Sequence, residues 1–152
     1  MPPAEGAIPY LVVKGAADAI AFYQRVFDAQ VSGRLDAPDG VLHAELKVGP
    51  ARFMLTEERP ERGALGPLAL GGSATHAVLY VPDADATVAR AVAAGAKVGM
   101  PVADQFWGDR SGTITDPFGH QWFVSTHQED LTNEQIEQRL RAMMAQSGPA
   151  CG

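Results

Sequence analysis

The strongest constraint on how this chain can fold is an internal repeat, in which two similar segments follow one another. When Val13 is aligned with Val81, an apolar run in each copy leads into a helical pattern at the same distance, and Gly49 later falls opposite Gly119 after a small change in offset. Each copy has the pattern of a strand, a helix and three further strands. One copy alone cannot bury both faces of its sheet, so the two copies are expected to pack together around a ligand-binding cleft.

Apolar periodicity locates the elements inside the two copies. The elements predicted for the first copy are strands at residues 8–13, 42–48 and 51–56 and a helix at 16–27. Those predicted for the second copy are strands at residues 77–81, 111–116 and 121–125, a further strand starting at 96, and a helix at 83–94. Asp116, Pro117 and Gly119 are typical of a tight turn between the last two strands. Thr132 and Gln135 match a capping box, which predicts a final amphipathic helix.

These elements predict an α+β fold, in which two βαβββ modules form a curled mixed sheet with a central cleft, followed by a C-terminal helix. A chain of 152 residues suits a single domain, 1–152. The predicted boundaries are residues 8–57 for module one, 58–74 for the linker, 75–127 for module two and 132–146 for the helix. The Gly-rich stretch at 63–73 is interpreted as linker, because a phosphate loop would need a Lys-Ser/Thr pair after it and a strand before it.

Charge and cysteine content limit the classes of binding partner and the cell compartment that we expect. The net charge is −6 and the 12 Lys and Arg residues are scattered, which disfavours nucleic acid and anionic membrane surfaces. No window approaches the roughly 20 apolar residues of a membrane helix. Cys151 is the only cysteine, so the fold cannot depend on an intramolecular disulfide, and the N-terminus lacks the pattern of a signal peptide. We therefore expect a cytoplasmic protein.

Several segments resemble a known family. AIAFYQRVF, HAVLYVPDADATVARAVAAGA and FWGDRSGTITDPFGHQW resemble the vicinal oxygen chelate superfamily of glyoxalases, dioxygenases and bleomycin-resistance proteins. PYLVV, LHAELKVG, DQFWGDR and DPFGHQW resemble its PhnB-like branch. The resemblance covers roughly residues 8–126. It implies the fold more strongly than the reaction, because this fold supports several chemistries.

The resemblance also implies where a metal would be held. Metal-dependent relatives take His and Glu ligands from the first and last strand of each module, and the corresponding positions here are Ile8, Phe53, His76 and Phe123. Ile and Phe have no lone pairs, and a transition metal needs three or four N, O or S ligands. We therefore expect no metal and no cofactor at these positions. A relocated site that uses His43, Glu45, His120 or His127 stays open, although His120 and His127 are interpreted as solvated side chains.

The metal-ligand positions of the relatives, transferred to this sequence, also give the expected pocket lining. If the ligand positions face inward, strand alternation brings the following residues to the cleft: Ile8, Tyr10, Val12, His76, Val78, Tyr80, Phe53, Leu55, Phe123 and Ser125. The candidate ligand-binding residues among them are Tyr10, Phe53, His76, Tyr80 and Phe123, which favour an apolar or aromatic compound. His43 and Glu45 share one strand face, either as a pocket acid–base pair or as a surface pair.

The run at 105–110 supplies the remaining candidates, Phe106, Trp107 and Arg110. Phe106 and Trp107 could stack on a ligand ring while Arg110 pairs with a carboxylate or phosphate. The structural alternative is that Arg110 pairs with Asp109 or Asp116 and that Trp107 covers the sheet edge.

Two functions remain open at this point. The first is a metal-free module that binds a largely apolar or aromatic small molecule in the cleft. The second is a glyoxalase-like lyase or isomerase, in which His76 acts as general base and Arg110 stabilises developing charge. In both cases we expect a homodimer, because relatives commonly pair their modules and the C-terminal helix offers an apolar face.

Overall fold

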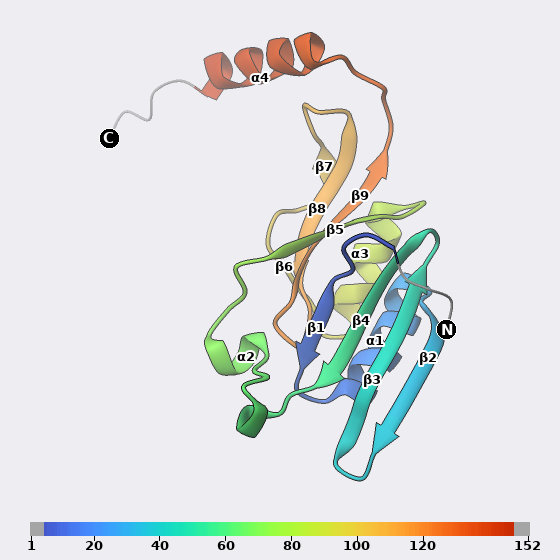
Figure 1. The fold of residues 1–152 in the computed structure, drawn as a ribbon. Coiled ribbons are helices and arrows are strands. Elements are labelled where there is room, and N and C mark those ends of the chain that lie inside the picture. Colours follow the sequence, from blue (N-terminus) through green and yellow to red (C-terminus); the bar gives the residue numbers. More distant parts are fainter. Residues whose placement is uncertain (1–4, 148–152) are drawn as a thin grey trace.

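The computed structural model describes residues 5–147, so Cys151 lies outside the described residues. The first module is a four-stranded sheet with one helix packed on it (Figure 1). Its elements are β1 (Tyr10–Val13), α1 (Ala16–Phe27), β2 (Gln30–Ala37), β3 (Gly40–Val48) and β4 (Ala51–Glu57). The strand order is β1-β4-β3-β2, and only the β1–β4 pair is parallel.

The second module repeats this arrangement with an interrupted edge. Its elements are β5 (His76–Tyr80), α3 (Ala84–Ala93), β6 (Lys97–Val98), β7 (Ala103–Asp104), β8 (Asp109–Thr115) and β9 (Gln121–His127). The order is β5-β9-β8-β6, with β5 parallel to β9, and β7 also pairs with β8. The linker between the modules contains a 3₁₀ turn, η1 (Pro60–Arg62), and the short helix α2 (Pro67–Leu70). The predicted α+β fold with two βαβββ modules is confirmed.

The edge strands are where the structure departs from the predicted elements. The sequence did not locate β2, because this strand has no buried residue and therefore no apolar face to reveal it. The corresponding strand of module two is broken into β6 and β7, with Pro101 between them. Proline has no N–H for a sheet ladder, which suits it to such an interruption.

One hydrophobic core joins the helix-facing sides of both sheets. The strands contribute the buried side chains of Leu11, Leu46, Phe53, Leu55, Ile114, Trp122 and Val124. The helices α1 and α3 lie behind the strands in Figure 1 and pack on this side, with Tyr23 and Val26 of α1 fully buried. Because one side of each sheet is sealed by helices, the opposite sides are left to form the inner faces of the molecule.

A buried carboxylate ties the two modules together. Tyr23 of α1 donates its hydroxyl hydrogen to Asp116 Oδ2 over 2.5 Å, and the indole N–H of Trp122 donates to the same oxygen over 2.9 Å. Asp116 Oδ1 accepts the backbone N–H groups of Phe118 and His120. Burial, followed by the negative charge of Asp116, raises the pKa of Tyr23 well above its usual value. The Asp116 turn therefore also fastens module two to α1.

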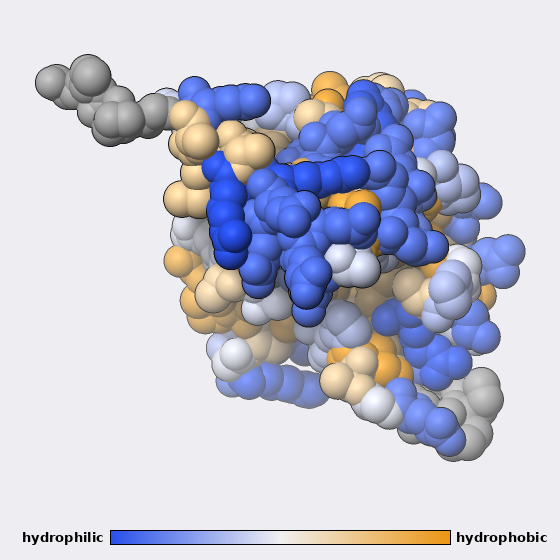
Figure 2. Space-filling view, turned by 90° about the horizontal axis from the view of Figure 1, so that it is seen from above, coloured by the Kyte–Doolittle hydropathy of each residue, from blue (hydrophilic) through white to orange (hydrophobic). Residues whose placement is uncertain are grey.

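The C-terminal helix stands apart from this core. Helix α4 (Asn133–Ser147) begins at the predicted capping box, since the backbone N–H of Thr132 donates to Gln135 Oε1 and the N–H of Gln135 donates to Thr132 Oγ1. None of its residues is buried, and it projects beyond the end of β9 (Figure 1). The face of the molecule seen from above is mainly hydrophilic, with small apolar patches (Figure 2). Within residues 5–147, no helix has the length and apolar character needed to cross a membrane.

Candidate functional site

The inner faces of the two sheets carry large side chains that the described chain leaves uncovered. Strand alternation places Tyr10 on the inner face of β1, and Val78 and Tyr80 on the inner face of β5. Their exposed fractions are 50% for Tyr10, 59% for Val78 and 56% for Tyr80. Exposed apolar and aromatic groups gathered on one face are typical of a surface that binds a ligand or a partner.

A groove of about 360 Å³ lies where β1 meets β5. It is lined by Pro9, Tyr10, Leu11, Ser73, Thr75, His76, Ala77, His120, Gln121 and Trp122. Two of the candidate residues, Tyr10 and His76, are thus brought together from different modules. The groove is small and only partly enclosed, which suits one ring-sized group rather than a whole large ligand.

Tyr10 is held in place by His43 of β3. The Tyr10 hydroxyl lies 3.0 Å from His43 Nδ1, and the two rings stack with centroids 5.6 Å apart and planes 23° apart. Tyr10 pairs with Met54 in the strand register, so its ring must cross β4 to reach β3. The pair forms a flat aromatic floor on the inner face of module one. His43 therefore lies on the inner face beside the groove, and both alternatives for it, a pocket pair or a surface pair with Glu45, stay open.

Two further histidines surround the groove. His120 is half-buried, and its Nε2 lies 2.9 Å from the backbone oxygen of Val12, which can only accept a hydrogen bond. Nε2 therefore carries the proton, and the interpretation of His120 as a solvated turn residue is wrong. His76 is exposed, and its ring is tilted against that of Phe123 at 5.7 Å. Phe123 thus lies on the inner face, as expected.

Phe53 does not reach the cleft. Its side chain is 3% exposed and packs edge-on against Tyr23 and Trp122 in the core. The strand register explains the correction, because Tyr10 pairs with Met54 whereas Val78 pairs with Phe123. Met54, one residue along, is therefore the inner-face counterpart of Phe123. Leu55, which is fully buried, belongs to the core for the same reason.

The corrected positions still do not fit a metal. The four positions become Ile8, Met54, His76 and Phe123, which offer one imidazole and one thioether. A thioether is a soft ligand that suits copper(I) rather than the divalent ions bound by His and Glu. Among residues 5–147, no group of three or more His, Cys, Asp and Glu side chains is arranged to hold a metal ion.

A second cluster lies at the far end of the inner face of module two. Asp109 is buried and accepts hydrogen bonds from the Tyr80 hydroxyl at 2.7 Å and the Trp107 indole N–H at 3.2 Å. Its other oxygen lies 2.9 Å from His127 Nδ1, and His127 Nε2 lies 2.7 Å from Asp130. This cluster orients Tyr80 and Trp107, two of the candidate residues.

The charges in this cluster reinforce one another. Hydrogen bonding to Asp109, and then to Asp130, raises the pKa of His127. Burial opposes ionisation of Asp109, but the hydrogen bonds from His127, Tyr80 and Trp107 outweigh it and lower the pKa of Asp109. The hydrogen bond to Asp109 is also the main reason why the pKa of Tyr80 is raised. His127 is consequently an ion-pair partner in the folded protein rather than a freely solvated side chain.

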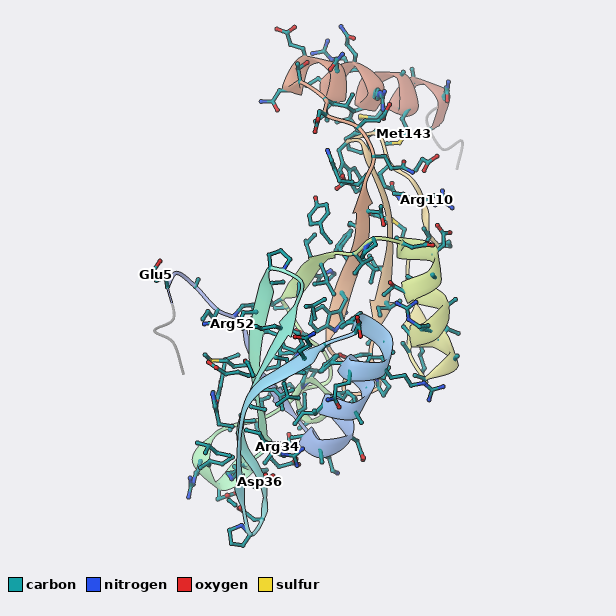
Figure 3. The ribbon with its side chains drawn as sticks, turned by 90° about the vertical axis from the view of Figure 1, so that its right-hand side faces the viewer. Glu5, Arg34, Asp36, Arg52, Arg110 and Met143 are labelled. Atoms are coloured by element: carbon teal, nitrogen blue, oxygen red, sulfur yellow. The ribbon has the colours of Figure 1, made fainter. Side chains whose placement is uncertain are left out.

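Arg110 lies on the other side of the sheet. Its guanidinium Nε donates to Asp85 of α3 at 2.6 Å and its Nη1 to Asp104 of β7 at 3.1 Å, which raises the pKa of Arg110. Figure 3 shows Arg110 beside α3, whereas Arg52 lies on the opposite side of the molecule. Arg110 is therefore not placed to pair with a ligand carboxylate or phosphate in the cleft, and its partners also differ from Asp109 and Asp116, which the structural alternative named. Phe106 packs edge-on against Trp107 at the turn before β8.

The fold and the inner faces define a class of protein built from paired βαβββ modules around an open cleft. Residues 7–124 match the family model described as Glyoxalase/Bleomycin resistance protein/Dioxygenase superfamily. The chain belongs to this superfamily, as the resemblance implied.

Individual relatives agree with this assignment. An uncharacterized protein of Mycobacterium tuberculosis strain H37Rv is 40% identical over 133 residues, covering 85% of this chain and 78% of the relative. The crystal structure of an Arabidopsis thaliana gene product is similar, with a TM-score of 0.65 at 29% identity, covering 81% of this chain and 99% of that one. A PhnB protein of Bacillus cereus shares the fold, with a TM-score of 0.62 at 18% identity, covering 80% of this chain and 99% of that one.

Proposed function

We propose that this protein binds a largely apolar or aromatic small molecule in the cleft between its modules, without a catalytic metal. The observation that carries the proposal is the uncovered row of Tyr10, Val78 and Tyr80 on the inner faces, next to a groove shared by both modules. Exposing these apolar and aromatic side chains to water costs free energy unless a ligand or a partner covers them. Membership of the superfamily supports small-molecule binding as the general role.

The binding proposal can be tested with a thermal-shift panel of naphthalene, indole and biphenyl derivatives. Val78→Arg places a charge on the inner face at an exposed site, so it should abolish the shifts and leave the melting temperature of the free protein almost unchanged. Val98→Arg is the matched control, because Val98 is also exposed but pairs with the core residue Ile114 on the other side of the sheet. A panel that leaves the melting temperature unchanged throughout would count heavily against ligand binding.

The metal-free part of the proposal has its own test. Protein purified without chelator or affinity tag, and then exposed to Mn, Ni, Zn and Fe in turn, should contain well under one equivalent of each by elemental mass spectrometry. The expected reason is the donor set, which offers a single imidazole at the four family positions. One equivalent of any metal, with a higher melting temperature, would overturn this part.

A second candidate function is a lyase or isomerase with His76 as general base. The observation in its favour is that His76, His120 and Tyr10 line one groove, so a proton acceptor and hydrogen-bond donors lie close together. The ion pairs of Arg110 with Asp85 and Asp104 leave this mechanism without the charge-stabilising group first considered for it. Unchanged turnover in His76→Ala, for a substrate that the wild type transforms, would rule this mechanism out.

We also propose that two copies associate as a homodimer through the exposed faces. Helix α4 supports this, because it has no buried residue and exposes Met143 and Met144. Light scattering should give twice the chain mass, and Met144→Glu should weaken the dimer whereas Gln138→Glu should not. A monomer at all concentrations would contradict the proposal. The cytoplasmic location stays a prediction from the sequence.

A further inference from the structure

Glu45 of β3 is a buried carboxylate without a partner in the described chain. The residue is 4% exposed, and the only side-chain hydrogen bond that reaches it within residues 5–147 goes from Ser32 to its backbone oxygen. The strand register pairs Glu45 with Met54, so it lies on the inner face of module one, in line with His43 and Lys47. Glu45 therefore belongs to the face that carries the Tyr10–His43 floor.

The carboxylate of Glu45 is nevertheless within reach of a ligand. Every fully enclosed side-chain N or O atom in the described chain has a hydrogen-bond partner. Since the Glu45 oxygens have none, they must keep a narrow opening to the surface. A carboxylate held mostly out of water without a partner costs folding free energy, and a cationic donor that reached it through this opening would remove that cost.

The neighbouring row of the same face carries two positive charges without an anionic partner in the described chain. Lys47 of β3 and Arg52 of β4 are directly opposite each other in the strand register, and neither forms an ion pair within residues 5–147. Like charges directly opposite one another destabilise a sheet unless an anion lies between them. Figure 3 shows Arg52 on the side of the first sheet away from α1. Lys47 lies two positions after Glu45 along β3, which is about 7 Å in a strand.

We propose that the ligand of this cleft is an aromatic zwitterion, with an ammonium or similar cationic donor at Glu45 and a carboxylate or similar anion at Lys47 and Arg52. The ring of the ligand lies against the flat floor of Tyr10 and His43, whose stacked rings are beside Glu45. This inference rests on the proposed binding function and names the chemical class of its ligand. The adjacent, oppositely charged and unpaired rows on one face carry the argument.

Four indole probes test the contribution of each ligand charge separately. 3-(2-Hydroxyethyl)indole is neutral, tryptamine is cationic, indole-3-propionate is anionic and tryptophan is zwitterionic. By calorimetry, the full-length protein should bind tryptophan about tenfold or more tightly than the neutral probe, as expected for charge-assisted hydrogen bonds. Glu45→Gln should remove the advantage of tryptamine over the neutral probe. Lys47→Met with Arg52→Met should remove the advantage of indole-3-propionate.

Matched controls are Glu134→Gln in α4 and Arg25→Met in α1, which remove one charge of each sign away from the inner face and should leave all four affinities unchanged. Equal binding of the four probes to the wild type would overturn the zwitterion inference and leave the proposed function standing. Binding of none of the probes, or of any compound in the larger panel, would overturn both.

The stability of the ligand-free protein gives an independent readout. Because Glu45 is unpaired, Glu45→Gln should melt at the same temperature as the wild type or higher. A melting temperature several degrees lower would mean that Glu45 is paired with Lys47 or Arg52 inside the protein, and that result would also overturn the inference.

Discussion

Removing the hydroxyl of Tyr23 should destabilise the protein far more than removing that of either other tyrosine. Tyr23 is fully buried and donates to the side-chain oxygen Oδ2 of Asp116, and Tyr23→Phe takes away this donor without changing the ring packing. Asp116 keeps the Trp122 indole N–H and two backbone N–H groups, so the carboxylate loses one of its four donors. A hydrogen bond to a charged group contributes roughly 1.5–3 kcal/mol. We therefore expect a loss of about 2 kcal/mol, and a melting temperature about 4–8 °C lower for a chain of this size.

The chain's three tyrosines form a matched series for this measurement. Tyr10→Phe and Tyr80→Phe remove hydroxyls from side chains that are half exposed, where water replaces the lost partner, so each should cost about 1 kcal/mol or less. Urea unfolding of the three variants, with equal m-values, gives the comparison directly. If Tyr23→Phe cost no more than Tyr10→Phe, Asp116 would not be the link between the modules described above.

Two further predictions concern charged groups away from the β1–β5 groove. Glu57 accepts the backbone N–H groups of Gly15 and Ala16 at the start of α1, at 2.9 and 2.6 Å, so Glu57→Ala should cost about 1 kcal/mol in urea unfolding, and no change would contradict the capping role. The raised pKa of His127 means that its ion pair with Asp109 stabilises the fold fully below the unfolded value of about 6.5 and less as pH rises through the folded value. The difference in urea midpoint between wild type and His127→Gln should therefore be largest near about pH 5–6 and shrink toward about pH 9, and a pH-independent difference would contradict this.

The repeat predicted the architecture because the repeated pattern involves many residues at once. Which single residues face the cleft, in contrast, is changed by a shift of one residue in the strand register. Phe53 and Phe123 align in the sequence, yet one is in the core and the other on the inner face, because β4 and β9 differ by one residue in their register to the first strand of their module. A one-residue shift turns a side chain to the opposite face of a sheet. No apolar pattern marks the difference, since Phe53 and Met54 are both apolar.

The polar parts of the site were harder to predict for a different reason. Glu45 and Asp109 both occur in strands that mix buried with partly exposed side chains, so their burial is decided by residues distant in the sequence rather than by local pattern. For Arg110, the carboxylates that bind it are not Asp109 and Asp116, which are near it in the sequence. Asp85 comes from a helix 25 residues earlier, and only the packing of α3 on β8 brings it close. The sequence could name these residue types but not the side of the sheet to which they belong.

The parallel pairs β1–β4 and β5–β9 also affect how the chain folds as it is synthesised. In each module the first strand finds its neighbour only after the last strand has been made, and pairings that distant in sequence form slowly. Until then β1 is unpaired and its side chains Leu11 and Val13 are exposed. When β9 is made later, it offers β1 a second possible partner strand, equivalent to β4. A chain whose β1 paired with the wrong last strand, or with that of a neighbouring chain, would keep most of its local contacts. Refolding at high concentration should therefore favour exchanged, domain-swapped assemblies over unstructured aggregates.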